Sequence, residues 1–171
     1  MITSPNNVIL VGFMGTGKTC VGEALAKRLG YKYVDTDDLI EVRAGKVISR
    51  IFAEDGEAYF RALESEIATE LESFRDHVIA TGGGIIKADD NIAALNRAGT
   101  VVCLLARPEV IYERVKDETH RPLLEVPDPQ GRIVELLAER RAQYEKSGYQ
   151  LDTSDLTTDQ VVDHIIALVR R

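Results

Sequence analysis

The sequence predicts an α/β fold, in which parallel strands are joined by helices that pack against the sheet. Two observations predict it. Short apolar runs alternate with longer segments whose apolar residues recur at helical spacing. A glycine-rich loop lies between the first apolar run and the first helical segment. The 171 residues contain no repeat, linker or low-complexity tract, so a single domain spanning residues 1–171 is expected.

The first half of the chain contains three predicted strands. The apolar run from Val8 to Val11 predicts a buried strand. The segment from Thr19 to Leu29 predicts a helix because its apolar residues fall on one face. The other elements expected in this half are a strand at 31–34, a helical region from Asp38 to about Phe74 with breaks near Gly45 and Gly56, and a strand at 78–80.

The second half alternates in the same way. Gly99 ends a helix predicted over 89–98, and the apolar run at 100–105 predicts a buried strand. Pro108 suits the first turn of a helix that reaches about Lys116. The remaining elements are a polar, proline-bearing loop at 117–131, a helix from Ile133 to about Lys146, a possible strand at 149–152, and a helix at 161–169 that follows a capping-box pattern at Thr157 and Gln160.

A phosphate-binding loop is the most specific motif in the chain. Residues 12–19 follow the pattern G-x-x-x-x-G-K-T between a predicted strand and a predicted helix. The loop's backbone N–H groups and the helix N-terminus favour phosphate. Lys18 is expected to reach the β- and γ-phosphates, and the Thr19 hydroxyl to ligate Mg²⁺. An incidental glycine-rich turn would not explain four fixed positions. The nucleotide-binding residues expected here are Gly15, Thr16, Gly17, Lys18, Thr19 and Cys20.

Two carboxylates follow the second predicted strand. The carboxyl ends of parallel strands meet at one edge, so the P-loop, the stretch Asp35–Asp37 and the loop 82–84 are expected to share a cleft. Asp35 and Asp37 are expected on the same side of an extended segment. One can hold Mg²⁺, and the other can accept a proton from a substrate hydroxyl. The alternative is a solvated acidic turn in which Asp38 caps a helix.

Two further segments supply groups suited to a polar substrate. Arg61 and Glu64 are three residues apart on a predicted helix, so the glutamate is expected to hold the guanidinium for a bidentate grip on a carboxylate. An exposed ion pair is the alternative. Gly82, Gly83 and Gly84 follow the third strand, where their backbone can approach a ligand closely. A flexible turn explains these glycines equally well.

Basic residues gather at the start of the long loop, although the chain has a net charge of −7. A mobile loop that carries arginine can close over ATP, exclude water and offset charge on the transferring phosphoryl group. An ordinary charged surface loop is the alternative. Arg140 and Arg141 follow on the next helix, and either can face the cleft. The basic residues of the loop are Arg114, Lys116, His120 and Arg121.

Composition excludes several classes of function. The net charge of −7 argues against general binding to nucleic acid or to anionic membranes. No apolar run approaches the ~20 residues of a membrane span. The first residues lack the pattern of a secretory leader, so a cytoplasmic location is expected. The two cysteines are too few for a disulfide scaffold.

Taken together, these segments resemble the shikimate kinases over almost the entire chain. The P-loop alone indicates only a nucleotide, but the order and spacing of the other segments are highly specific. The resemblance rests on residues 12–19, 35–37, 51–64, 82–84, 121–124 and 140–144.

The resemblance implies a fold and a reaction. The fold is of the nucleoside-monophosphate-kinase type, a three-layer α-β-α arrangement with a five-stranded parallel sheet, a substrate-binding helical region at about 36–74 and a mobile lid at about 115–130. The reaction is ATP-dependent phosphorylation of the 3-hydroxyl of shikimate, a step toward chorismate and the aromatic amino acids. Mg²⁺ is the implied cofactor, ATP and shikimate are the implied partners, and a monomer is expected.

The resemblance also implies roles for individual residues. Asp35 resembles the carboxylate near the metal, and Asp37 the carboxylate that meets the shikimate hydroxyls and acts as base. Arg61 and Arg140 would hold the shikimate carboxylate, while Gly82 to Gly84 line its ring. The remaining assignments are Arg121 as the lid arginine that acts in catalysis with Lys18 and Asp37, Arg114 as a cation on the nucleotide side, Phe52, Phe60, Pro122 and Leu123 as apolar walls, and Asp152 to Ser154, including Thr153, around adenine.

The chain departs from the family pattern at two places. Cys20 replaces the hydroxyl residue common after the metal-ligating threonine, which should not affect the chemistry. The segment 152–155 offers no arginine to stack on the base, so the nucleotide-base selectivity stays open. Two rival functions share the P-loop: a kinase of another small polyol such as gluconate, and a nucleotide-responsive binding protein without catalysis.

Overall fold

The structure, a computed structural model, describes residues 6–119 and 121–170. The N-terminal residues 1–5, His120 of the predicted basic cluster and Arg171 lie outside the described residues. The strands are β1 (Asn7–Gly12), β2 (Lys32–Asp35), β3 (His77–Ala80), β4 (Gly99–Leu105) and β5 (Tyr149–Asp152). The α-helices are α1 (Lys18–Leu29), α2 (Thr36–Ala44), α3 (Ile48–Glu54), α4 (Glu57–Glu70), α5 (Asp89–Ala98), α6 (Pro108–Val115), α7 (Pro129–Ser147) and α8 (Thr158–Val169). Three short 3-10 helices complete the described elements: η1 (Leu71–Ser73), η2 (Ile85–Lys87) and η3 (Pro122–Leu124).

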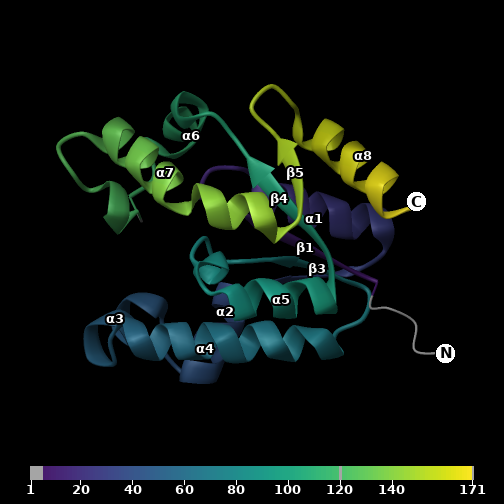
Figure 1. Ribbon diagram of the computed structural model, residues 1–171, viewed down its shortest axis with the longest axis horizontal. Coiled ribbons are helices and arrows are strands. Elements are labelled where there is room, and N and C mark those ends of the chain that lie inside the picture. The colour runs from purple at the N-terminus through teal and green to yellow at the C-terminus, as the bar shows by residue number, and fades with distance from the viewer. Residues whose placement is uncertain (1–5, 120, 171) are drawn as a thin grey trace.

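The described strands form one five-stranded sheet in the order β2-β3-β1-β4-β5, and every pairing is parallel. This confirms the predicted α/β class and the possible fifth strand. β1 lies at the centre, where Val8 pairs with Val78 on one side and with Thr100 on the other. All six residues of β1 are buried because helices cover both faces of the sheet (Figure 1), which explains the unbroken apolar run from Val8 to Val11.

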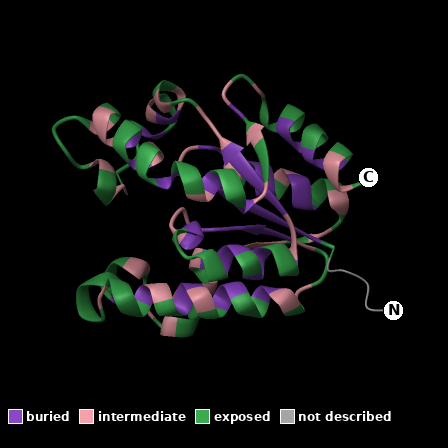
Figure 2. Ribbon diagram, in the orientation of Figure 1, coloured by how far each residue is buried: buried purple, intermediate pink, exposed green. Residues whose placement is uncertain are grey.

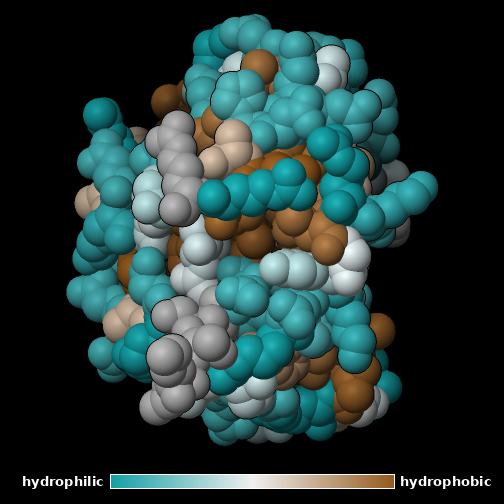
Figure 3. Space-filling model, turned by 90° about the vertical axis from the view of Figure 1, so that its right-hand side faces the viewer, coloured by the Kyte–Doolittle hydropathy of each residue, from teal (hydrophilic) through white to brown (hydrophobic). Residues whose placement is uncertain are grey.

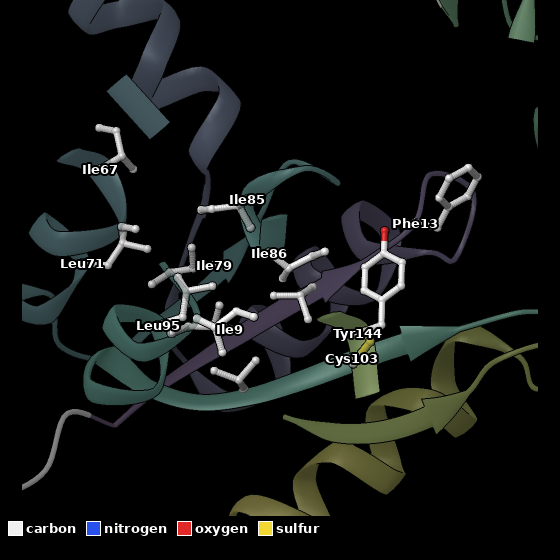
Figure 4. Packing of buried hydrophobic residues seen from close by; sticks show 14 of the residues in the cluster. Ile9, Phe13, Ile67, Leu71, Ile79, Ile85, Ile86, Leu95, Cys103 and Tyr144 are labelled. Atoms are coloured by element: carbon white, nitrogen blue, oxygen red, sulfur yellow. The ribbon is translucent and has the colours of Figure 1, made fainter. Parts of the chain in front are cut away.

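Alternate residues of β1 supply two separate cores. Val8 and Leu10 pack with apolar residues of α1 and α8. Ile9 and Val11 point to the opposite face, into a larger cluster that includes residues of α4, α5 and α7. Figure 2 shows the resulting buried central strands and the buried stripes along the covering helices. Cys103 lies in the larger cluster beside Tyr144 in Figure 4 and is fully buried, as its strand predicted.

Two glycines separate the helices of the region predicted at 36–74. α2 ends at Gly45, which has a φ of 69°, and α4 begins after Gly56, which has a φ of 87°. The predicted breaks are therefore confirmed, and three α-helices and η1 occupy this region. In Figure 1, α3 lies at the same end of the molecule as the segment between α6 and α7.

The segment predicted as a loop at 117–131 is shorter than expected. α7 begins at Pro129 instead of Ile133, because Asp128 accepts a hydrogen bond from Gly131 N and Pro129 occupies the first turn. The segment between α6 and α7 is therefore 116–128, and it contains η3.

The predicted capping box of α8 is present, with reciprocal hydrogen bonds between Thr157 and Gln160. Among residues 6–119 and 121–170, no helix is long and apolar enough to cross a membrane. Figure 3 shows the face on the right-hand side of Figure 1, where hydrophilic side chains surround a hollow with apolar ones.

Candidate active site

A cleft of about 590 Å³ lies at the carboxyl edge of the sheet. It is lined by segments that follow β1, β2, β3 and β5, as the parallel topology requires. The structure brings most of the residues that we predicted for nucleotide, metal or substrate to this one cleft, whereas Asp152 and Ser154, predicted around adenine, are not among its lining residues. The predicted residues that line it are Gly15, Thr16, Gly17, Lys18, Thr19, Cys20, Asp35, Asp37, Arg61, Gly82, Gly83, Gly84, Arg114, Arg121, Arg140 and Thr153.

The P-loop has a backbone that only glycine adopts readily. Gly15 and Gly17 have φ values of 75° and 102°, and Gly17 is the N-cap of α1. A Cβ at Gly12 would overlap the carbonyl oxygen of Leu104 on β4. The first turn of α1 has no acidic residue of its own, which suits an anion at this helix N-terminus.

The Lys18 ammonium folds back over the P-loop. Its Nζ donates to the carbonyl oxygens of Gly12 at 2.6 Å and of Phe13 at 2.9 Å. Burial, followed by the charge of Arg121, lowers the pKa of Lys18 to about 8. The side chain therefore stays mostly protonated at neutral pH, and its charge is held at the phosphate end of the cleft.

Asp35 and Asp37 do not lie on one extended segment, so this part of the prediction is wrong. Asp35 ends β2 and is itself the N-cap of α2, because its Oδ1 accepts from the backbone N–H of Asp37 at 2.8 Å. Asp38 is therefore not the cap that the alternative reading required. Asp37 lies in the first turn of α2 and still faces the cleft with Asp35.

The Asp37 carboxyl differs from an ordinary exposed aspartate. Its Oδ1 is buried and has no hydrogen-bond partner among the described residues. Burial, together with the charges of Asp35 and Glu64, raises the pKa of Asp37 to about 6. A carboxyl that ionises near neutral pH can accept a proton more readily than an ordinary aspartate. Burial also raises the pKa of Asp35.

Oxygen ligands suited to Mg²⁺ line the same part of the cleft. The exposed first turn of α1 presents the Thr19 hydroxyl, and β2 ends in the Asp35 carboxylate. Mg²⁺ in kinases takes one or two protein ligands and completes its shell with phosphates and water. No group of three or more His, Cys, Asp or Glu side chains in the described chain could hold a metal alone. The oxygen donors of Thr19 and Asp35, which line one cleft, fit an ion of this kind.

The pair of Arg61 and Glu64 lies at the other end of the cleft, as predicted. Arg61 Nη1 donates to Glu64 Oε1 at 2.9 Å, and only 2% of the Glu64 side chain is exposed. The guanidinium also packs on the ring of Phe60 and against the backbone of Gly84. This is a fixed, half-buried cation rather than the exposed ion pair of the alternative.

Arg140, and not Arg141, faces the cleft. Arg140 is 8% exposed, and its Nη1 donates to the Gly83 carbonyl oxygen at 3.4 Å. Its guanidinium lies 5.6 Å from the centroid of the Phe13 ring. Arg141 points outward and pairs with Glu145. The two arginines are adjacent in the sequence, so only the structure could decide between them.

Tyr144 is a buried polar residue that sequence reasoning missed. Its hydroxyl donates to the same Gly83 carbonyl oxygen, at 3.3 Å. Burial raises the pKa of Tyr144, and the neighbouring Arg140 partly offsets the rise. In Figure 4 its ring extends toward the loop that carries Phe13. The signal was available, because Tyr144 lies one helical turn after Arg140.

The backbone of the glycine loop, 82–84, lines the cleft and also makes a hydrogen bond within the protein. The Gly82 N–H donates to the Thr36 hydroxyl at 3.1 Å, so this N–H group is not free for a ligand. A Cβ at Gly82 would lie 2.7 Å from Asp37 Oδ1. The absence of a side chain here therefore leaves the Asp37 carboxyl its place in the cleft.

The nucleotide end is closed by Arg114 and Thr153. Arg114 donates to the carbonyl oxygens of Gly15 and Thr153, each at 3.0 Å. The Thr153 hydroxyl in turn donates to Thr16 O at 2.9 Å. These bonds tie α6 and the segment after β5 to the P-loop.

An arginine does lie at the segment 152–155, although the segment contains none. Arg107, at the start of α6, pairs with both carboxylate oxygens of Asp155 at 2.9 and 3.1 Å. Its backbone N–H also donates to the Ser154 hydroxyl at 2.9 Å. Sequence reasoning missed this contact.

The predicted lid segment, 115–130, contributes two charged side chains, Glu118 and Arg121, and one apolar side chain, Leu123, to the lining of the cleft. Arg121 lines the cleft and donates to Glu118 at 2.6 Å, and Leu123 lines it too. Of the other predicted apolar walls, Phe60 lines the cleft, whereas Phe52 stacks behind it with ring centroids 4.8 Å apart. Pro122 is not among the lining residues. Lining residues without a predicted role are Met14, Val21, Ile48, Thr81, Glu118, Leu156, Thr158 and Val161.

Known proteins share this sequence and this arrangement. The sequence model of the family described as shikimate kinase matches residues 14–170. The shikimate kinase of Thermodesulfovibrio yellowstonii is 46% identical over 160 residues, which cover 94% of this chain and 92% of that protein. The shikimate kinase of Caldanaerobacter subterraneus is 44% identical over 160 residues and 94% of each chain.

Solved structures agree in fold. The shikimate kinase from Acinetobacter baumannii, in complex with shikimate, has a TM-score of 0.90 and 36% identity, and the match covers 98% of this chain and 94% of that one. A gluconokinase from Sinorhizobium meliloti has a TM-score of 0.61 at 20% identity, over 98% of this chain and 93% of that one, which is a likeness of fold alone.

Proposed function

This chain belongs to the shikimate kinase family, and we propose that it transfers the γ-phosphate of ATP to the 3-hydroxyl of shikimate. The reaction is a step of the shikimate pathway, which leads to chorismate and the aromatic amino acids. One observation carries the proposal: a single cleft joins a P-loop to a buried carboxyl, Asp37, and to two held arginines, Arg61 and Arg140.

Position and charge are what this reaction asks of a protein, because its transition state is largely dissociative. We assign phosphate binding to the P-loop and Lys18, and stabilisation of the transferring group to Arg121. Arg61 and Arg140 hold the shikimate carboxylate and so align the reactive hydroxyl. Asp37 accepts the proton of that hydroxyl. The pKa of about 6 for Asp37 supports this role, because the carboxyl is mostly ionised at neutral pH.

We assign Mg²⁺ binding to Thr19 and Asp35. Held by these two residues, the ion would supply positive charge that offsets the negative charge of the ATP phosphates. The oxygen donors of these two residues support the assignment. Thr153 and Arg114 are assigned to the nucleotide side, with Gly15 to Cys20. A monomer in the cytoplasm, without nucleic-acid or membrane partners, and a lid that moves stay predictions.

ADP release with Mg·ATP and shikimate tests the function directly. Shikimate-dependent turnover is expected, with gluconate and acceptor-free reactions as controls. Turnover with gluconate but not shikimate would keep the P-loop assignment and discard the clamp of Arg61 and Arg140. ATP binding without turnover on either acceptor would favour the non-catalytic rival.

Arg140→Ala and Arg141→Ala form a matched pair for the clamp. The two arginines are neighbours on α7, but only Arg140 is buried in the cleft. Arg140→Ala is expected to raise the shikimate KM and Arg141→Ala to leave it unchanged. Equal effects would remove Arg140 from the substrate site.

A further inference from the structure

Two buried polar side-chain atoms of the described residues have no hydrogen-bond partner in the protein: Asp37 Oδ1 and the Tyr33 hydroxyl. Such atoms are uncommon, because a buried donor without an acceptor has lost its hydrogen bond to water and gained none in return. The proposed reaction explains the first atom, which faces a substrate hydroxyl. It does not use Tyr33, so the second atom requires another explanation.

Tyr33 lies on β2, two residues before Asp35, and its ring packs on α1 at Gly22. A Cβ at Gly22 would lie 2.6 Å from Cε2 of Tyr33 and 3.2 Å from Cδ2. Glycine inside a helix is less favourable than alanine. At this position it leaves the space that the tyrosine ring fills.

This packing directs the phenol toward the metal end of the nucleotide site. Gly22 lies three residues after Thr19, so the two share a face of α1. The Thr19 side chain lies close to the Tyr33 hydroxyl, although the two atoms do not meet normal hydrogen-bond geometry. A tyrosine hydroxyl carries one O–H donor, and here that donor has no acceptor among the described residues.

We propose that the Tyr33 hydroxyl is a positioning group for Mg²⁺, which donates a hydrogen bond into the oxygen shell that Thr19 and Asp35 begin. The partner that the protein does not supply is then a water or an oxygen ligand of the ion, present only when Mg·nucleotide is bound. This inference rests on the proposed function, since it takes the Thr19 and Asp35 end of the cleft as the metal end. Groups that orient a metal shell from behind the direct ligands typically change metal affinity by ~10–100-fold when removed.

Tyr33→Phe tests the proposal because it keeps the ring on Gly22 and removes only the hydroxyl. The measurement is the affinity of Mn²⁺, used as a paramagnetic substitute for Mg²⁺, for the protein saturated with ADP, read from the signal of free Mn²⁺ in electron paramagnetic resonance. We expect a loss of about tenfold in Mn²⁺ affinity. The Mg²⁺ concentration needed for half-maximal turnover should rise in parallel, while the shikimate KM stays unchanged.

Tyr31→Phe is the matched control, because Tyr31 is also partly buried against the α1 and α8 core. It should leave Mn²⁺ affinity unchanged. The proposal would be overturned if Tyr33→Phe bound Mn²⁺ as tightly as the parent protein does. It would also be overturned if Tyr31→Phe lost as much Mn²⁺ affinity as Tyr33→Phe.

Thermal unfolding without ligand separates this role from a purely structural one. Tyr33→Phe removes a buried polar atom that has no protein partner, so its Tm should equal or exceed that of the parent protein. A lowered Tm with unchanged Mn²⁺ affinity would assign the hydroxyl to stability and reject the proposal. Mn²⁺ binding with ADP does not require shikimate, so this test stays readable even if the protein phosphorylates a different acceptor.

Discussion

The two ends of the cleft are built from different parts of the chain. At the nucleotide end, side chains bind backbone carbonyl oxygens: Lys18 binds Gly12 and Phe13, and Arg114 binds Gly15. At the acceptor end, charged side chains come from separate elements, with Asp37 on α2, Arg61 and Glu64 on α4, and Arg140 on α7.

This difference determines how each end responds to substitution. A site made of backbone N–H groups tolerates many side-chain changes, provided that the glycine conformations and the lysine remain. A site made of charged side chains loses a defined interaction with each residue removed. Substitutions at the acceptor end should therefore change the shikimate KM and kcat independently of each other. Substitutions at the nucleotide end should not have this effect.

The largest effect is expected where the two ends meet. Asp37→Asn removes the proposed base and should lower kcat by ~10²–10⁴-fold, with little change in the ATP KM. Lys18→Ala should lower kcat by a similar amount and also weaken the binding of ATP. Steady-state kinetics with both substrates varied measures this. Asp38→Asn, at the exposed neighbouring position, is the control, and near-normal turnover in Asp37→Asn would remove the base assignment.

Asp37→Asn should also make the folded protein more stable at high pH. The pKa of Asp37 is about 6 in the fold and 3.8 in a model peptide, so folding favours the protonated carboxyl. The stability it contributes is complete below pH 3.8 and is lost as the pH rises through 6. Ionised Asp37 therefore costs the fold up to ~3 kcal/mol at pH 8. Asp37→Asn should raise Tm at pH 8 more than at pH 5, and an equal change at both values would contradict the raised pKa.

Arg61→Ala should separate binding from catalysis at the acceptor end. Losing a charge-assisted contact with a carboxylate costs ~1.5–3 kcal/mol, so the shikimate KM should rise by ~10–100-fold. The ATP KM should change little, because Arg61 makes no contact with the P-loop among its described interactions. Arg50→Ala on α3, which removes an exposed arginine paired with Glu54, is the control. An unchanged shikimate KM in Arg61→Ala would remove the clamp.

The sheet and the P-loop were predictable because their signals are local. Strand burial on both faces leaves an unbroken apolar run, and a P-loop leaves fixed glycines in a continuous segment. The contact of Arg61 with Glu64 was predictable for the same reason, since i,i+3 residues are neighbours on a helix.

Other parts of the site depended on long-range contacts that periodicity does not reveal. Asp35 as a cap, and Arg140 rather than Arg141 in the cleft, depend on where one helix begins and which face of another is buried. Arg107 and Asp155 are separated by 48 residues, and the signs of their charges alone could not pair them. The resemblance to a known family supplied the acceptor end, because its residues come from four separate segments.

Tyr144→Phe should give a smaller effect of the same kind as Arg61→Ala. The hydroxyl and Arg140 share the Gly83 carbonyl oxygen, so removing it loosens the arginine without removing the charge. A neutral hydrogen bond contributes ~0.5–1.5 kcal/mol, which predicts a rise of ~2–10-fold in the shikimate KM. The kcat should stay unchanged. The control is Tyr149→Phe, at an exposed position of β5, which should change neither the shikimate KM nor kcat. A fall in kcat with an unchanged KM would show that Tyr144 does not act through Arg140.

Arg107→Ala should have the smallest effect, and it should act on the KM of ATP rather than on that of shikimate. The pair with Asp155 is exposed, and such pairs contribute little, so we expect the ATP KM to rise only by about two- to fivefold. The shikimate KM should stay constant, because the contact fixes the segment after β5 and lies away from Arg61 and Arg140. Exchanging the charges, with Arg107→Asp and Asp155→Arg together, should restore the ATP KM if the pair holds this segment in place. A double variant no better than either single one would show that the nucleotide end keeps its shape through its backbone contacts alone, which would make the contrast between the two ends sharper still.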